Sequence, residues 1–267
     1  MENIQHHTNI EHQTDSRIQE LEKALAEAHN LIESLKASNT LANEFVSFAA
    51  HQIRGPIGAI KGYISLVLEG DFGDVPPGFA EPLNIVLKST DNLGKTVNDF
   101  LDVSRIEQGE MRYYRKDFDL THLANEAINE MKKIIEGKGL EIRLHISPEV
   151  LTIHGDKAKI KHVLLNLVDN ACKYTDKGWI EISLAKNDRK VIFCVRDSGV
   201  GIRPETMPLL FQKFSRCIAA GKTNIHGTGL GLYVAKKMME DQNGRVWAES
   251  EGEGKGSQFY VELDLIM

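Results

Sequence analysis

Residues 45–70 read FVSFAAHQIRGPIGAIKGYISLVLEG, and this stretch decides how the chain is organised. Its apolar and small residues recur at alternating spacings of three and four, which is typical of the seam of an α-helical coiled coil. His51 falls two residues after one seam position, Ala49, and two before the next, Ile53. The stretch therefore predicts a helix that packs through one face and presents a histidine towards solvent.

The same spacing continues upstream, so one helix is expected from about residue 15 to Glu69. Polar Asn39 interrupts the seam. A seam of this length is typical of two helices that pair, although a coil packed on the rest of its own chain would use the same pattern. The upstream seam positions are Ile18, Leu21, Leu25, Ala28, Ile32, Leu35, Ala42 and Val46.

Pro56 lies five residues after the histidine. Proline has no backbone N–H and crowds the carbonyl four residues earlier, here that of Gln52, so we expect a kink or a loosened turn beside His51. A lone histidine on a helix is usually an ordinary surface residue. His51 gains a chemical role only from the motifs that follow it in the chain.

Residues 70–78, GDFGDVPPG, end the long helix, because two prolines and three further glycines favour a turn. A second helix is expected from near Phe79 to Gln108, antiparallel to the first, with Gly109 at its C-cap. One such hairpin buries too little apolar surface to be stable. Two hairpins from two chains would close a four-helix bundle, so the sequence predicts a homodimer.

The composition is that of a soluble globular protein with one or two domains, because 42% of its 267 residues are hydrophobic and 26% are charged. A formal net charge of -6 and a pI near 5.9 argue against nucleic acid or an anionic membrane as a partner. No apolar run approaches the roughly 18 residues of a membrane helix, so we expect no direct membrane insertion. Three cysteines without metal or redox spacing indicate reduced thiols and a cytoplasmic location.

The pattern changes after residue 116 to alternating helices and strands, which indicates a second domain of the α+β sandwich class, with helices on one face of a mixed sheet. The predicted domains are a flexible tail, 1–14, a coiled-coil helix, 15–44, a helical hairpin, 45–109, a linker, 110–116, and the sandwich domain, 117–267. The predicted elements of the sandwich are helices 119–137, 157–174 and 229–242, strands 140–146, 151–155, 179–185, 190–196, 244–250 and 257–264, and a long loop, 198–228.

Three polar residues share one face of the predicted helix 157–174: Asn166, Asn170 and Lys173. Asparagine oxygens are neutral hard ligands that suit Mg²⁺ when phosphates supply the negative charge, and a neighbouring lysine can meet those phosphates. Polar residues on a helix usually just face water, so this cluster alone is weak.

Two glycine-containing motifs follow. Asp197 stands at the end of an apolar strand, where a carboxylate can accept from the exocyclic amine of adenine, and Gly199 and Gly201 allow the backbone to approach a ring. A simple Asp-Gly turn is the alternative. Residues 227–232, GTGLGL, open a helix whose free N–H groups and dipole favour a phosphate.

Taken in order, five motifs resemble the H, N, G1, F and G2 boxes of sensor histidine kinases. No single box is persuasive, but five in the right order over about residues 45–263 are very specific. The motifs are His51-Gln-Ile-Arg-Gly-Pro, Asn166-Leu-Val-Asp-Asn170-Ala-Cys-Lys173-Tyr174, Asp197-Ser-Gly-Val-Gly201-Ile, Phe211-Gln-Lys-Phe214 and Gly227-Thr-Gly-Leu-Gly-Leu232.

The resemblance implies a dimerisation and phosphoacceptor hairpin followed by a Bergerat-type ATP-binding domain. It implies that ATP and Mg²⁺ bind there and that residues 211–228 form a lid. In the catalytic step it assigns His51 as phosphoacceptor, with Gln52 beside it, Lys173 as a phosphate contact and Arg216 as a contact to the transferred phosphoryl group. It assigns Asn170 to Mg²⁺ and places at the nucleotide Asn166, Asn170, Lys173, Tyr174, Asp197, Gly199, Gly201, Phe214, Gly227, Thr228, Gly229, Leu230 and Gly231.

The implied reaction is attack of a neutral imidazole on the γ-phosphorus of ATP, which gives phosphohistidine and ADP. The phosphoryl group would then pass to an aspartate of a separate response regulator. A separate sensor protein upstream is a further possible partner, because nothing before residue 15 resembles a sensor domain.

Three residues depart from the family pattern. His226 stands where a glycine commonly precedes the G2 core, where it could narrow the motion of the lid or have only a surface or packing role. Gln52 stands where most members have an acidic residue; an amide can hold the ring but cannot act as a base, so we expect slower autophosphorylation. Gly55 replaces the Thr or Asn that members with phosphatase activity carry, so that activity is doubtful. An ATP-binding pseudokinase and a Bergerat-type ATPase without phosphohistidine are the rival interpretations.

Overall fold

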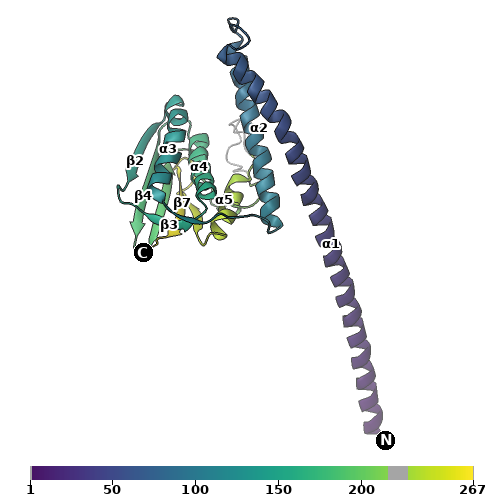
Figure 1. Ribbon diagram of the computed structural model, residues 1–267. Helices are drawn as coiled ribbons and strands as arrows, with labels where there is room; N and C mark the ends of the chain where they lie inside the picture. Colours follow the sequence, from purple (N-terminus) through teal and green to yellow (C-terminus); the bar gives the residue numbers. More distant parts are fainter. Residues whose placement is uncertain (1, 216–227, 267) are drawn as a thin grey trace.

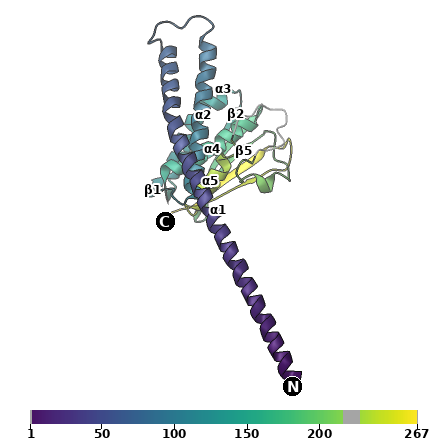
Figure 2. The same ribbon diagram turned by 90° about the vertical axis from the view of Figure 1, so that its right-hand side faces the viewer.

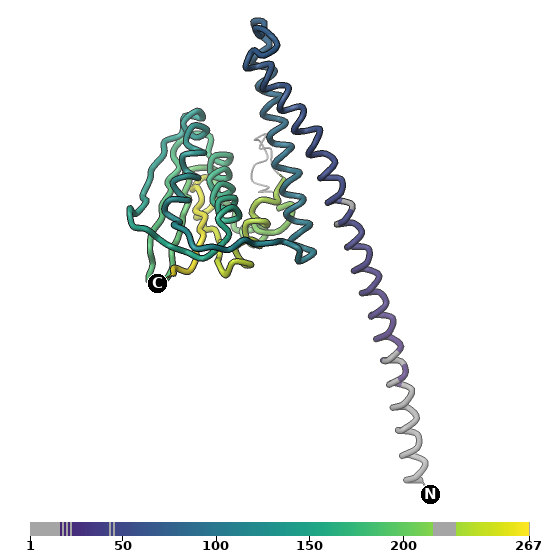
Figure 3. Tube along the Cα trace, in the orientation of Figure 1, coloured from purple at the N-terminus to yellow at the C-terminus, as the bar shows by residue number. Residues whose placement is uncertain are grey.

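The computed structural model describes residues 2–215 and 228–266 of the chain. An antiparallel helical hairpin is followed by an α/β domain, and the first helix projects far beyond both (Figure 1). The view turned by 90° and the tube trace show the same projecting helix and the same hairpin (Figures 2 and 3). The expected fold class, a helical hairpin and an α/β sandwich, is confirmed.

Helix α1 (Glu2–Glu69) is continuous over 68 residues and contains Pro56 in its interior. The helix therefore does not end at the proline. It also includes residues 2–14, which we expected to be a flexible tail. These residues contain no glycine or proline, and extending an existing helix costs far less free energy than starting one.

Helix α2 (Ala80–Glu107) runs back along α1 and ends where the sequence predicts. Gly109 has a φ of 68°, its N–H bonds to the carbonyl of Ile106, and the N–H of Glu110 bonds to the carbonyl of Arg105. This is a Schellman motif, which satisfies the last carbonyls of the helix. Within the hairpin, the residues buried between the two helices are Ala50, Ile57, Val97 and Leu101.

The α/β domain contains a five-stranded mixed sheet in the order β2-β4-β5-β7-β6, in which only β2 and β4 are parallel. A separate antiparallel pair joins β1 and β3. The strands are β1 (Lys116–Asp119), β2 (Glu141–Ile146), β3 (Thr152–Gly155), β4 (Trp179–Asn187), β5 (Lys190–Asp197), β6 (Arg245–Glu249) and β7 (Ser257–Asp264).

Three helices cover one face of this sheet: α3 (Leu120–Gly137), α4 (Lys157–Tyr174) and α5 (Gly231–Glu240) (Figure 1). Asp119 and Asp156 cap α3 and α4 by accepting hydrogen bonds from the N–H groups of Thr121 and Lys159. A short 3-10 helix, η1 (Met207–Leu209), lies in the long connection between β5 and α5. The core is made by the apolar faces of these helices and the inner face of the sheet.

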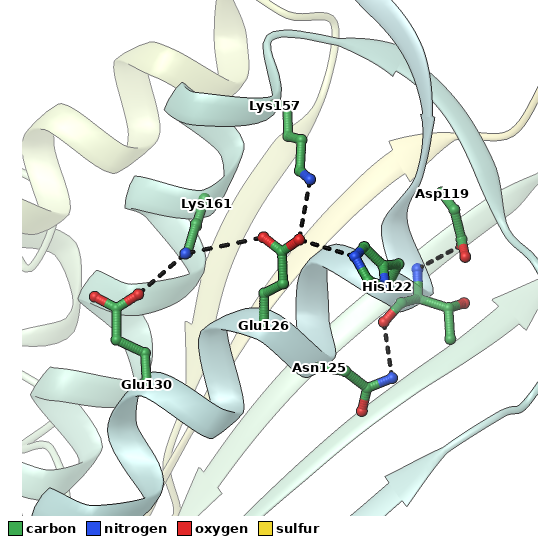
Figure 4. A network of polar contacts seen from close by, with 8 residues as sticks. Asp119, His122, Asn125, Glu126, Glu130, Lys157 and Lys161 are labelled. Atoms are coloured by element: carbon green, nitrogen blue, oxygen red, sulfur yellow. Dashed lines mark hydrogen bonds and ion pairs between the residues drawn. The ribbon is translucent and has the colours of Figure 1, made fainter.

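A polar network also joins α3 to α4 on the surface (Figure 4). Glu126 of α3 is its centre, because its carboxylate contacts Lys157 at 3.1 Å, His122 at 2.9 Å and Lys161 at 3.9 Å. Lys161 contacts Glu130 at 3.0 Å. These contacts connect the two helices above their buried apolar faces.

The structure differs from the sequence prediction in two further places. Strand β1 was not predicted, because KDFD contains one apolar residue and strands are usually recognised by several. Helix α5 begins at Gly231 instead of residue 229. Among the described residues, no helix is both long and apolar enough to cross a membrane.

Candidate functional site

A cleft of about 1040 Å³ lies between α2 of the hairpin and α4 and α5 of the α/β domain. One wall is therefore the hairpin and the other is the domain that carries the predicted nucleotide motifs. The predicted residues that line it are Asn166, Asn170, Lys173, Tyr174, Gly201, Thr228, Gly229 and Gly231. The structure thus brings together residues that lie up to 65 positions apart in the sequence.

The polar side chains of α4 are arranged so that they could coordinate a metal ion and contact a phosphate. The amide nitrogen of Asn170 donates to Oδ1 of Asn166 over 3.4 Å, which leaves the Asn170 oxygen free to accept or to coordinate. Lys173 is held by Asp169, one turn earlier, with 2.7 Å between Nζ and the carboxylate. Asp169 also lines the cleft, and the sequence analysis did not single it out.

Asp197 ends β5 and is almost completely buried, with 2% of its surface exposed. Its carboxylate accepts from Ser257 Oγ at 2.5 Å and from the N–H of Gly199 at 2.8 Å. Burial raises the pKa of this carboxyl, and the hydrogen bonds from Ser257 and Gly199 oppose that rise. Ser257 itself lines the cleft. Pairing of β5 with β7 places the two residues opposite each other, a register that the sequence does not reveal.

Three glycines of the motifs lie where neighbouring atoms of the chain leave no room for a Cβ atom. A Cβ on Gly199 would lie 2.2 Å from the carbonyl oxygen of Tyr174, and one on Gly231 would lie 2.7 Å from the amide of Asn166. Gly201 has a φ of 71° and its Cβ would lie 2.0 Å from a backbone oxygen. Side chains at these positions would therefore displace the neighbouring backbone or the side chain of Asn166.

The base of the predicted lid contacts the hairpin. The ring of Phe214 packs against Phe100 of α2, with 6.4 Å between the ring centroids. Thr228 Oγ1 donates to Asp99 of α2 at 3.4 Å and accepts from the N–H of Leu230 at 3.2 Å. The Leu230 side chain is buried in the core of the domain. The predicted residues Arg216 and Gly227 lie outside the described residues, as does His226.

Acidic residues of α2 form part of the hairpin wall. Asp102 is 7% exposed and pairs with Lys159 at 3.2 Å and with His162 at 3.7 Å. Asp99 lies one turn earlier, and burial raises its pKa. Neither residue was singled out from the sequence, because their surroundings come from contacts between two distant segments.

His51 and Gln52 are exposed on α1, as the seam predicts, and neither lines the cleft. Where the structure describes the side chains of α1, Arg54 is the residue of that helix that lines it. In this conformation the predicted phosphoacceptor is therefore on the hairpin but outside the cleft that contains the predicted nucleotide residues.

Two family models match the chain. The model for the His Kinase A (phospho-acceptor) domain matches residues 41–109, and the model for the Histidine kinase-, DNA gyrase B-, and HSP90-like ATPase matches residues 155–267. The first match covers the hairpin with His51. The second covers α4 to the end of the chain, which includes the α/β wall of the cleft.

Similar proteins agree with these matches. The chain is 32% identical over 243 residues to hybrid signal transduction histidine kinase B of Dictyostelium discoideum, which covers 89% of this chain and 12% of that protein. It is 31% identical over 255 residues to the circadian input-output histidine kinase CikA of Synechococcus elongatus, covering 94% of this chain and 33% of that protein. The chain therefore spans a third or less of the length of these two relatives.

Among solved structures, full-length ShkA in complex with AMPPNP superposes with a TM-score of 0.67 at 24% sequence identity. The superposition covers 84% of this chain and 46% of ShkA. At this level of identity the likeness concerns the fold, namely a helical hairpin joined to an α/β domain.

Proposed function

Because the chain belongs to the sensor histidine kinases of two-component systems, we propose that it is an ATP-dependent autokinase that phosphorylates His51. The phosphoryl group then passes to an aspartate of a separate response regulator. The active form is a homodimer, and an upstream sensor protein supplies the signal through α1.

One observation carries the proposal: a single cleft is lined on one side by residues of the N, G1 and G2 motifs and on the other by α2 and Arg54 of the hairpin that carries His51. Asp197, Gly199, Phe214 and Leu230 are not among the lining residues. Asp197, at the end of β5, supplies a carboxylate for the exocyclic amine of adenine. Asn166 and Lys173, about two turns apart on α4, supply a donor and a charge for the phosphates. Thr228 and the N–H groups at the start of α5 extend the phosphate site.

The donor set fits Mg²⁺. Asn170 presents a neutral hard oxygen whose own amide nitrogen is already bonded to Asn166. Mg²⁺ usually keeps few protein ligands and takes the remainder from substrate phosphates and water. When bound with ATP, the ion would neutralise charge on the phosphates.

The reaction needs a neutral imidazole and an in-line approach to the γ-phosphorus. A ring nitrogen of His51 forms the new N–P bond, the bond from phosphorus to the β,γ-bridging oxygen breaks, and its electron pair leaves with ADP. The proton of the ring then goes to water, because Gln52 has no basic group. The domain must move relative to the hairpin, since His51 is outside the cleft in this conformation.

Incubation of the purified chain with Mg²⁺ and γ-labelled ATP tests the proposal. We expect label that is acid-labile and base-stable, and that disappears in His51→Gln and in Asn170→Asp. A receiver domain added afterwards should remove the label from the protein. Nucleotide binding without any label would favour the pseudokinase, and phosphate release without label would favour a simple ATPase.

A further inference from the structure

Arg54 connects the helix of the phosphoacceptor to the cleft. Its Nη2 donates to Oδ1 of Asn98 on α2 over 3.0 Å, and both residues line the cleft. His51 lies three residues earlier on the same helix, so the two Cβ atoms are about 5–6 Å apart. The guanidinium therefore already reaches the cleft from a position next to the histidine.

None of the described residues neutralises the charge of Arg54. Among the described residues Arg54 takes part in no ion pair, and its hydrogen-bond partner Asn98 is a neutral amide. The other link between the two helices of the hairpin is different: Lys61 pairs with Asp91 at 2.7 Å, and neither residue lines the cleft. In the contact of Lys61 with Asp91 the cation is neutralised by a carboxylate. Arg54 instead contacts a neutral amide and lines the cleft.

The acidic residues of the same wall have partners of their own. Asp102 is paired with Lys159 and His162, and Asp99 accepts from Thr228. A guanidinium fork that keeps its charge is suited to two oxygens of one phosphoryl group, because its N–H donors match that geometry.

We propose that Arg54 is a further catalytic residue, which contacts the γ-phosphoryl oxygens as the group moves from ATP to His51, and that Asn98 is the positioning residue that holds it. The inference rests on the proposed function. As the N–P bond to His51 forms and the P–O bond to ADP breaks, Arg54 stabilises charge on the oxygens and exchanges no proton. Because it contacts the group most closely during transfer, it lowers the barrier more than it strengthens ATP binding.

The test measures the rate of labelling at His51 against ATP concentration in the full chain. Arg54→Gln should lower kcat by roughly 100-fold with little change in KM, by analogy with the loss of one charge-stabilising donor. Arg54→Lys should fall between that variant and the parent, because lysine keeps the charge but loses the fork. Asn98→Ala should lower kcat by about 3-fold to 10-fold, as expected when a positioning hydrogen bond is removed.

Lys61→Gln is the matched control, since it removes the other interhelix contact without touching the cleft, and its kcat should stay within about 2-fold of the parent. Thermal unfolding and sedimentation show whether each variant keeps its fold and association state. If the parent is labelled but Arg54→Gln and Arg54→Lys keep its kcat, or if Lys61→Gln falls equally, the role of Arg54 is wrong. If the parent is never labelled, the proposed function fails and this inference with it.

Discussion

The hairpin and the α/β domain bury their apolar residues to very different degrees. In the domain, Leu164 and Leu167 are completely buried within one large core. In the hairpin, four residues form the buried cluster of a single chain, and Val86 of α2 is 45% exposed. In the coiled-coil segment before it, Leu25 and Leu35 are 72% and 60% exposed. Leu25 and Leu35 occupy positions of the predicted seam.

This difference is what the proposed homodimer predicts, because the domain then folds within one chain and the hairpin is completed by a second. A row of exposed leucines and isoleucines along a helix is characteristic of a surface that another protein covers. A second copy presents the same seam, so it supplies a matching surface without any other partner. Variants that act on one half alone can therefore test the comparison.

Leu167→Ala should have the largest effect, and it should be confined to the domain. Removing a completely buried leucine from α4 costs about 2–5 kcal/mol, because the lost contacts leave a cavity. We expect the melting temperature of the domain to fall by about 5–15 °C while the chain stays associated. Calorimetry and sedimentation would show this, and dissociation together with unfolding would contradict the separation of the two halves.

Val86→Asp should weaken the association of two chains and leave the α/β domain intact. A carboxylate buried without a partner in the proposed bundle costs a few kcal/mol, so the dimer should dissociate at about 100-fold higher concentration or more. The melting of the α/β domain should not change. Asn84→Asp is the control, because it adds the same charge two residues away on an exposed part of α2. Equal dissociation in both variants would mean that the face of α2 that carries Val86 is not the interface.

The sequence predicts the domain well because its elements have clear patterns and clear ends. Helix α4 starts after the capping residue Asp156, and α2 ends before Gly109, as helix signals indicate. The outward position of His51 follows from the seam alone. Strand β1 was missed because a short charged strand has no periodic pattern.

The sequence predicts less of the cleft, because its two walls are brought together by contacts between segments that are distant in the sequence. Motifs identify Asn166, Asn170 and Lys173, which one helix holds together. Ser257 reaches Asp197 through strand pairing, and Asp99 reaches Thr228 through packing of α2 against the domain. No local pattern marks these residues, since their surroundings exist only in the folded chain.

Asp99→Asn tests the contact between the two halves. Asp99 lies beside Thr228 on the wall opposite α4, and its carboxylate would repel the phosphates of a bound nucleotide. Removing that charge should strengthen ATP binding by about 3-fold to 10-fold, which equilibrium titration can measure. Asp91→Asn, on the same helix but paired with Lys61 away from the cleft, should leave the affinity unchanged. Weaker binding in Asp99→Asn would mean that the carboxylate helps to hold the nucleotide.

Glu126→Gln should have the smallest effect, a slight loss of stability at neutral pH that disappears in acid. A hydrogen bond from Lys157, assisted by the charges of Lys157, His122 and Lys161, lowers the pKa of Glu126 from its ordinary value of 4.5. A carboxyl group whose pKa is lower in the folded state contributes stability above its unfolded pKa and loses it as the pH falls through the folded pKa. The parent should therefore lose slightly more stability than Glu126→Gln as the pH falls below about 4.5.

Urea unfolding of the domain at pH values from 7 to 3 measures this difference. Glu136→Gln serves as the control on the same helix, because its contact with Lys132 is long, at 3.9 Å, and does not reach α4. If both variants respond to acid like the parent, the network shown in Figure 4 adds no stability and the buried faces of α3 and α4 hold the two helices together unaided. A flatter profile in Glu126→Gln alone would show that a surface contact between these helices contributes to the stability of the half that folds within one chain.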